Sequence, residues 1–407
     1  MTNTTIEINP VTRIEGHAKI VLEVDEEGKI QKSYFPSTSM VRGFEYLVRG
    51  RDYHFVHMVV QRICGICPIP HGLASVEAIE DAIGLTVPDS AKILRELLSI
   101  GNKLNSHALH QYLILPDIEP NKENIPSVIE RIQEIRRLSQ KMVDIIGGEA
   151  IHPSNIKVGG MKSKLTPYSA ATLYRILRKC EIIIKLQRDY MTDVLMNKLN
   201  SLEHPIARFR ESMLASDMMY GNKKEIDFSA ITEITPYRFY QPDEPGRYTN
   251  IMIPLYYGEV VEVGPRARFS KFKDYNGNTP LHINIARARE MMILVYRALE
   301  LLDDLNLCSD VSCDYTIREG TGFGVIEAPR GTNIHSVGID NHGRIKNYNM
   351  IVPTTWNMPT VERALIGNHH ELAELIIRSY DPCVECATHS IIVKDEKGKE
   401  VQRRNFH

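Results

Sequence analysis

The chain has 407 residues, of which 43% are hydrophobic, so it can bury a large core in one big domain or two closely packed ones. Basic and acidic residues nearly balance, at 49 against 51, which argues against a nucleic acid or membrane surface recruited by charge. The sequence has neither a run of 18 apolar residues nor an N-terminal stretch typical of a signal peptide. We therefore expect a cytoplasmic protein without a transmembrane helix.

Hydrophobic spacing along the chain predicts an α+β protein dominated by helices. Residues 17–35 alternate and turn as a β-hairpin does, and helical spacing begins at about Arg42. The predicted long helices cover residues 89–115, 127–146, 169–199, 280–305 and 360–380. Residues 245–265 have the composition of strands, and residues 313–355 predict loops and short strands. Together these elements predict central long helices with small peripheral sheets.

The glycine-rich segment at residues 320–324 (GTGFG) is similar to a phosphate-binding loop, but no strand–turn–helix unit surrounds it. We expect it to shape a loop that leads to Arg330. No flavin, nicotinamide or iron–sulfur motif is visible in the sequence. Electrons from any redox reaction would therefore have to leave through a partner subunit.

Seven cysteines divide into two Cys-x-x-Cys pairs and three isolated residues. Cys64 and Cys67 form one pair, and Cys383 and Cys386 form the other, at opposite ends of the sequence. An odd number of cysteines in a long chain argues against a disulfide framework, whereas two such pairs can bring four thiolates onto one metal. We interpret the isolated cysteines as ordinary buried thiols: Cys180, Cys308 and Cys313.

Spacing alone favours a closed tetrahedral zinc site, because structural four-cysteine sites are the common outcome of two such pairs. Structural zinc usually occurs in small modules, where both pairs lie close together and the metal replaces a missing core. A chain of 407 residues has no such need. The cysteines by themselves therefore leave both a zinc staple and a redox metal open.

The residues around the two pairs resemble those of nickel–iron hydrogenase large subunits. Arg-x-Cys-Gly-x-Cys-x-x-x-His spans residues 62–71, and Asp-Pro-Cys-x-x-Cys-x-x-His spans residues 381–389. Further matches follow in the family's order: Arg13-Ile14-Glu15-Gly16-His17, Arg42-Gly43-Phe44-Glu45, His152-Pro153, Glu327-Ala328-Pro329-Arg330-Gly331 and Val352-Pro353-Thr354-Thr355-Trp356-Asn357. Each match is weak alone, but their order along nearly the whole chain makes the resemblance specific.

The resemblance implies a nickel–iron centre with four cysteine ligands. Cys64 and Cys383 would be terminal nickel ligands. Cys67 and Cys386 would bridge to an iron that carries carbonyl and cyanide ligands. The implied reaction is the reversible heterolytic cleavage of H2, which yields two protons and two electrons.

Further residues would serve this centre. Arg330 would lie beside the open metal position and act through its charge and its planar donors. Thr354 would hydrogen-bond a cyanide, and Glu15 would relay protons towards solvent. His71 would bond a cysteine sulfur, and Asp381 would support the metal ligands from outside.

Glu45 and His389 resemble two protein ligands of a second metal ion. The backbone carbonyl of Leu365 is the expected third ligand. A carboxylate with a carbonyl favours magnesium and an imidazole favours iron, so the identity of this metal stays open between the two.

Two points keep plainer interpretations open. Many respiratory members of the family carry His-Asp-His in the helix after the first cysteine pair. The stretch here is Asn105-Ser106-His107, so an acidic group beside the metals is expected to be missing. On the bare sequence, Glu15 could also be a strand-end glutamate that pairs with Arg13.

The resemblance divides the chain into a catalytic domain, residues 1–389, and a C-terminal extension, residues 390–407, which a maturation endopeptidase would remove. Electrons would pass to an iron–sulfur small subunit. The short length and the Cys-Pro-Ile-Pro-His variant are similar to cytoplasmic archaeal members that reduce a deazaflavin coenzyme, and a flavin-containing subunit would be a further partner. The alternatives are a metal-free structural component of a related redox complex, against which the four cysteines argue, and a zinc-stapled scaffold.

Overall fold

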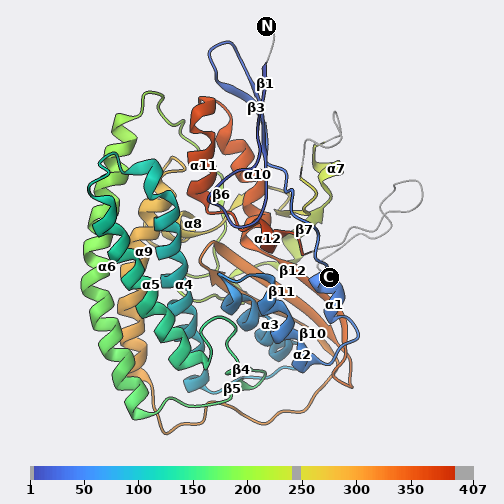
Figure 1. Ribbon diagram of the computed structural model, residues 1–407. Coiled ribbons are helices and arrows are strands. Elements are labelled where there is room, and N and C mark those ends of the chain that lie inside the picture. Colours follow the sequence, from blue (N-terminus) through green and yellow to red (C-terminus); the bar gives the residue numbers. More distant parts are fainter. Residues whose placement is uncertain (1–3, 241–248, 390–407) are drawn as a thin grey trace.

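The computed structural model describes residues 4–240 and 249–389, in which long helices form one side of the molecule and sheets with shorter helices form the other (Figure 1). The helices are α1 (Phe44–Val48), α2 (Tyr53–Val60), α3 (Pro68–Ala82), α4 (Asp89–Ile118), α5 (Ile125–Gly147), α6 (Pro167–Ser201), α7 (Pro236–Tyr240), α8 (Pro265–Phe272), α9 (His282–Asp304), α10 (Pro353–Leu365), α11 (Ala373–Tyr380) and α12 (Val384–Ala387). The strands are β1 (Thr4–Ile8), β2 (Ile20–Val24), β3 (Ile30–Tyr34), β4 (Ile156–Lys157), β5 (Gly160–Met161), β6 (Ser212–Met213), β7 (Ile231–Ile234), β8 (Ile253–Tyr256), β9 (Val261–Glu262), β10 (Gly320–Ala328), β11 (Gly331–Ile339) and β12 (Ile345–Ile351). The α+β class predicted from the sequence is confirmed.

Helices α4, α5, α6 and α9 pack side by side into a bundle (Figure 1). Local sequence signals set their ends. Thr166 caps α6 by accepting a hydrogen bond from the backbone N–H of Ser169, and Gly148 ends α5 in the left-handed conformation. All four helices lie where the apolar spacing predicts them. Their inner faces also bury charged side chains, because the bundle forms one wall of the site described below.

Strands β10, β11 and β12 form an antiparallel sheet with α3 packed against it. The segment at residues 320–324 therefore begins a nine-residue strand, and the prediction of a loop there is wrong. Its alternate glycines face the α3 backbone: a Cβ on Gly320, Gly322 or Gly324 would lie 1.9 to 2.2 Å from an atom of that helix. Glycine is required at these positions because the helix approaches so closely.

The N-terminal sheet has the order β1-β2-β3. It contains the predicted hairpin, since Val21 pairs with Tyr34 and Val24 with Ile30. In the described residues, no helix combines the length and the apolar character that crossing a membrane requires. The extension at residues 390–407 lies outside the described residues.

Candidate metal centre

The two cysteine pairs meet in the interior of the protein. Cys64 follows a short 3-10 helix, η1 (Gln61–Ile63), and Cys67 immediately precedes α3. Cys383 and Cys386 lie at the start of and within α12. All four side chains are buried, and their sulfur atoms lie within 4.8 Å of one another. The Sγ–Sγ distance is 3.6 Å both between Cys64 and Cys383 and between Cys67 and Cys386.

Backbone contacts from the N-terminal segment hold the second pair in place. Glu15 forms a parallel bridge with Cys383: the Glu15 N–H donates to the Pro382 carbonyl at 3.3 Å, and the Val384 N–H donates to the Glu15 carbonyl at 2.8 Å. Gly16 has φ +83°, and a Cβ there would lie 2.8 Å from the backbone nitrogen of Glu385. The motif around Glu15 therefore needs its glycine for the chain to approach the cysteines.

Four thiols packed this tightly have the chemistry of a cation site. Burial raises the pKa of Cys383 and Cys386 well above the usual value, whereas hydrogen bonds from Cys383 and Cys386 lower the pKa of Cys64 well below it. Four thiolates can coexist here only with a cation between them, because burial penalises each uncompensated charge. Soft sulfur ligands suit nickel, iron or zinc.

Arg330 supplies a fixed positive charge beside the cysteines. Its Nε–H donates to the Asp381 carbonyl at 2.6 Å, and its Nη2 donates to the Asp381 carboxylate at 3.0 Å. Burial opposes the charge, but Asp381 and the cysteines Cys383, Cys67 and Cys64 raise the pKa of Arg330 well above its usual value. Asp381, which the sequence placed outside the metal ligands as a support, thus orients this arginine.

Arg287 is a second buried arginine at the same carboxylate, and our sequence analysis missed it. Its Nη1 donates to Asp381 Oδ2 at 2.8 Å, and its Nε and Nη2 have no hydrogen-bond partner among the described residues. The signal was an arginine in the apolar first half of helix α9, where Arg287 is buried. Ser106, at the departure from the respiratory motif, lies 3.5 Å from Arg330 Nη1, so Asp381 is the carboxylate that both arginines share.

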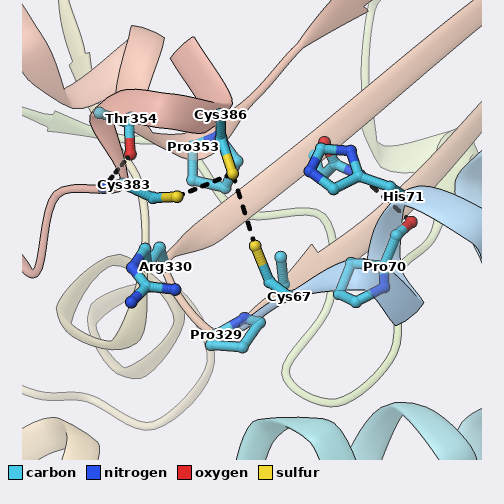
Figure 2. Close-up of a pocket in the computed structure, with 11 residues that line it drawn as sticks. Cys67, Pro70, His71, Pro329, Arg330, Pro353, Thr354, Cys383 and Cys386 are labelled. Carbon is cyan, nitrogen blue, oxygen red and sulfur yellow. Dashed lines mark hydrogen bonds between the residues drawn. The ribbon is translucent and has the colours of Figure 1, made fainter. Parts of the chain in front are cut away.

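A small cavity of about 10 Å³ lies against three of the cysteines (Figure 2). It has room for about one water-sized molecule. Figure 2 shows Arg330, Thr354 and Pro353 on one side of it, Pro329 below, and Pro70 with His71 on the opposite side. Its lining residues are Cys67, Pro70, His71, Ala328, Pro329, Arg330, Asn333, Pro353, Thr354, Cys383 and Cys386. Apolar walls with a few donors fit diatomic ligands better than a hydrated ion.

Thr354 is oriented as a donor towards this cavity. The backbone N–H of Cys383 donates to Thr354 Oγ1 at 2.9 Å, which leaves the hydroxyl proton of Thr354 for another acceptor (Figure 2). Cys67, Cys383 and Cys386 line the cavity, whereas Cys64 does not.

Glu15 lies partly buried beside the centre. Burial raises the pKa of its carboxyl, and the neighbouring Cys64 raises it further, while Arg330 lowers it. The alternative pairing with Arg13 does not form in the described residues, because Arg13 donates to Asp117 at 2.6 Å instead. A carboxyl group in these surroundings is suited to exchanging protons.

His71 has a partner other than the predicted cysteine sulfur. Its Nδ1 lies 3.2 Å from Nε2 of His335, whose Nδ1 lies 2.6 Å from the Tyr348 hydroxyl. Burial lowers the pKa of His71 to about 4, so the ring is neutral. His335 and Tyr348 were not predicted, because alternation along a strand does not show which inward side chains meet a helix.

Glu45 and His389 meet at a second buried site, and the backbone carbonyl there belongs to Met350. His389 Nε2 lies 3.6 Å from Glu45 Oε1 and 2.8 Å from the Met350 carbonyl, while His389 Nδ1 lies 2.6 Å from the Cys386 carbonyl. The predicted carbonyl of Leu365 instead accepts hydrogen bonds from Asn368, so that prediction is corrected.

The contacts of His389 favour a cation between it and its neighbours. Burial lowers the pKa of His389, while its contacts with two backbone carbonyls raise it. A neutral imidazole carries only one N–H. Both ring nitrogens face carbonyl oxygens, so in the neutral ring one nitrogen lone pair would point at another acceptor. A metal ion bound by His389 Nε2, Glu45 and the Met350 carbonyl would remove this conflict.

The isolated cysteines differ from one another. Cys180 is buried as predicted, whereas Cys313 is partly exposed and Cys308 is exposed. The prediction of a buried thiol is therefore wrong for Cys308, which lies in the turn after α9. These three lie apart from the four-cysteine group in the described residues.

Comparison with known proteins gives consistent results. A family model described as nickel-dependent hydrogenase matches residues 42–115 and 278–389, and one described as HoxL-like matches residues 5–39. The alpha chain of the coenzyme F420 hydrogenase of Methanocaldococcus jannaschii is 44% identical over 97% of this chain and 96% of its own length. A component of the F420-non-reducing hydrogenase vhu of the same organism is 32% identical over 88% of this chain and 97% of its own length. The Ni-Fe-Se hydrogenase of D. vulgaris Hildenborough superposes with a TM-score of 0.82 at 26% identity, covering 95% of this chain and 100% of that one.

Proposed function

The chain belongs to the nickel-dependent hydrogenase family, and from this premise we propose that its four cysteines hold a nickel–iron centre at which H2 is cleaved heterolytically. It is the large subunit of a hydrogenase, an oxidoreductase that acts on H2. One observation carries the proposal. Four buried thiols from both ends of the chain converge beside a fixed arginine and a cavity of diatomic size.

The matching sequence motifs divide the cysteines into terminal and bridging ligands, and three of the four, Cys67, Cys383 and Cys386, line the cavity. By these motifs, Cys67 and Cys386 would bridge to an iron whose carbonyl and cyanide ligands would lie beside this cavity. Cys64 and Cys383 would be terminal on nickel. When bound, such a centre supplies an open metal position that polarises H2. Arg330 and Thr354 would donate to the cyanides, and the prolines would exclude water.

Proton transfer is assigned to Glu15. H2 cleavage releases protons inside a buried site, where a carboxyl with a raised pKa can accept and release them. Two hydrogen bonds to Asp381 hold the guanidinium of Arg330 in place, so Arg330 would act by placing a positive charge that polarises H2.

Exchange between H2 and D2O tests the proposed reaction without an electron acceptor. The assembled protein is expected to form HD and D2 from H2 in D2O, because heterolytic cleavage returns one solvent-derived atom at each reversal. A purified, metal-loaded protein that produces no HD would refute the proposal. A zinc-stapled scaffold would contain zinc and would lack exchange.

A second metal at Glu45, His389 and the Met350 carbonyl is part of the proposal. Glu45→Gln keeps the shape but removes the anionic ligand, so the protein should lose about one equivalent of magnesium or iron. Elemental analysis of the purified protein measures this loss. Unchanged magnesium and iron in both Glu45→Gln and His389→Ala would show that the two side chains form an ordinary hydrogen-bonded pair.

Electrons would leave through a surface next to the first cysteine pair. Large apolar side chains are exposed on and just before α1 and α2, the elements that lead into Cys64: Met40, Val41, Tyr46, Leu47, Phe55 and Met58. Exposed apolar side chains concentrated on adjacent elements are typical of a protein interface. We assign this surface to an iron–sulfur small subunit, since the relatives are named as single subunits of larger hydrogenases.

Charge substitutions test that surface. Leu47→Glu with Phe55→Glu should abolish co-purification of the small subunit, because two carboxylates would be buried at the interface. Ile182→Glu with Leu186→Glu, on the exposed side of α6, is the matched control and should keep the partner. Equal partner yield from both double variants would contradict the assignment.

The proposed final electron acceptor is coenzyme F420, reached through a flavin-containing subunit. The 44% identity to a chain of an F420 hydrogenase, against 32% to one of an F420-non-reducing hydrogenase, supports this choice. H2-dependent bleaching of the coenzyme by the whole complex is the corresponding assay. If the complex reduced artificial acceptors but not coenzyme F420, the chain would instead belong with the F420-non-reducing hydrogenases.

Removal of residues 390–407 is the proposed last step of maturation. Cys383 and Cys386 lie close to the end of the chain, and His389 reaches Met350 across the fold. A tail that is still attached would keep this segment from closing over the metals. Intact-mass spectrometry of active protein should show a chain ending at His389, and active protein of full length would contradict this.

A further inference from the structure

A histidine cluster lies on the surface, apart from both sites described above. Apart from the four cysteines, one group of three or more ligand side chains in the described residues has its donor atoms within 4.8 Å of one another: His204, His369 and Glu371. His204 follows α6, and His369 immediately precedes a short 3-10 helix, η4 (His370–Leu372). The cluster therefore joins two segments that are far apart in the sequence.

The distances within the cluster fit ligands of one cation. His369 Nδ1 lies 3.7 Å from Glu371 Oε2. This separation is too long for a hydrogen bond. It is close to the distance of about 3.4 Å between two ligands on one tetrahedral zinc ion. The His204 and His369 rings are stacked with centroids 3.7 Å apart and planes at 15°.

His369 has a ring nitrogen that lacks a partner. Its Nδ1 is buried and makes no hydrogen bond within the described residues. Its Nε2 faces the turn between β2 and β3, where a Cβ on Gly28 would lie 2.6 Å away. The nitrogen that can take a ligand is therefore Nδ1, the one directed at Glu371. A buried polar atom left unpaired costs about 1 to 3 kcal/mol.

The surrounding backbone fixes the cluster. Asn368, next to His369, accepts a hydrogen bond from the Ala207 N–H at 2.7 Å and so ties the His204 segment to the His369 segment. The His370 N–H donates to the Gly28 carbonyl at 3.0 Å. Glu371 is exposed and His204 is half-buried, so a metal ion can enter from solvent. Such outer support is typical of metal sites.

We propose that His204, His369 and Glu371 bind a divalent transition metal, zinc or nickel, with water in the remaining position. Two imidazoles and one carboxylate form a ligand set that both metals accept. Binding requires the two rings to leave their stack by turning about their side-chain bonds, and torsions to an imidazole ring are soft. The bound ion would clip the loop after α6 to the connection between α10 and α11.

Titration of the mature, nickel–iron-loaded complex tests the proposal, because its cysteine centre is already occupied. After dialysis against a chelator, Zn²⁺ is added in competition with a chromophoric chelator, and Ni²⁺ is added in a parallel series. The wild-type complex should bind about one additional equivalent. His204→Gln and Glu371→Gln should each weaken this binding at least tenfold. Loss of a residue that only supports a ligand typically weakens metal binding by about 10- to 100-fold, and loss of a ligand itself should cost at least as much.

His342→Gln, which changes an exposed histidine elsewhere, is the matched control and should bind like wild type. Hydrogenase activity should be unchanged in all three variants, which shows that each one is folded. Equal stoichiometry and affinity in wild type and His204→Gln would overturn the proposal. So would the absence of any additional equivalent in the wild type.

Discussion

Glu15→Gln is expected to retain nickel and iron while losing about 99% or more of H2 turnover. The amide keeps the size of the side chain but cannot carry a proton, and general acid–base groups typically contribute 100-fold or more. The backbone of Glu15 holds Cys383 through the Pro382 and Val384 contacts, and these survive the change. The measurement is H2 oxidation with an artificial acceptor together with H2–D2O exchange and elemental analysis.

Two comparisons sharpen this test. Glu7→Gln changes an exposed glutamate that pairs with Lys19 and should retain wild-type rates. Arg330→Lys should also assemble with loss of most turnover, because lysine keeps the charge but cannot form the two directed bonds to Asp381. Exchange near the wild-type rate in Glu15→Gln would mean that Glu15 serves the fold alone and that protons leave by another route.

Cys383→Ser is expected to lose nickel and, with it, all measurable activity. Serine presents a neutral, hard hydroxyl where the site requires an anionic, soft sulfur. The site cannot rearrange to compensate, because Cys383 is held by the Glu15 bridge and by its hydrogen bond to Thr354. Elemental analysis should show nickel below about a tenth of the wild-type content, as a lost ligand on a four-thiolate ion implies.

Cys308→Ser provides the control for Cys383→Ser. Cys308 is exposed and lies apart from the four-cysteine group, so its replacement should leave nickel content and activity unchanged. Full nickel occupancy in Cys383→Ser would place the metal elsewhere and would contradict the assignment of all four cysteines.

Regular elements were predictable where a strong period coincides with a capping signal. Helix α6 has both, with a threonine cap and an apolar stripe, and its predicted range of 169–199 falls within Pro167–Ser201. Residues 313–355 were predicted as loops and short strands, but the glycine segment that begins β10 was predicted as a loop because glycine has low strand propensity. Pairing with β11 and the close approach of α3 explain why this segment is a strand. Tertiary packing, rather than local propensity, thus determines the strand conformation of residues 320–324.

The site was predictable only where residues lie in motifs. The cysteines and Arg330 have contiguous signatures, and the structure brings them together. The Met350 carbonyl was beyond prediction, because any residue supplies a backbone carbonyl and only the fold shows which one reaches His389. Arg287 was missed for a related reason: an arginine in a helix is usually exposed, and its burial depends on Asp381 arriving from another element.

Infrared spectroscopy of the purified complex tests the central claim most directly. Carbonyl and cyanide ligands on iron absorb in a window where protein and water absorb weakly, so their bands report the centre itself. The account predicts a set of carbonyl and cyanide bands that shifts when H2 is added, from ligands that would lie beside the cavity lined by Cys67, Arg330 and Thr354. Active protein without such bands would contradict the nickel–iron centre.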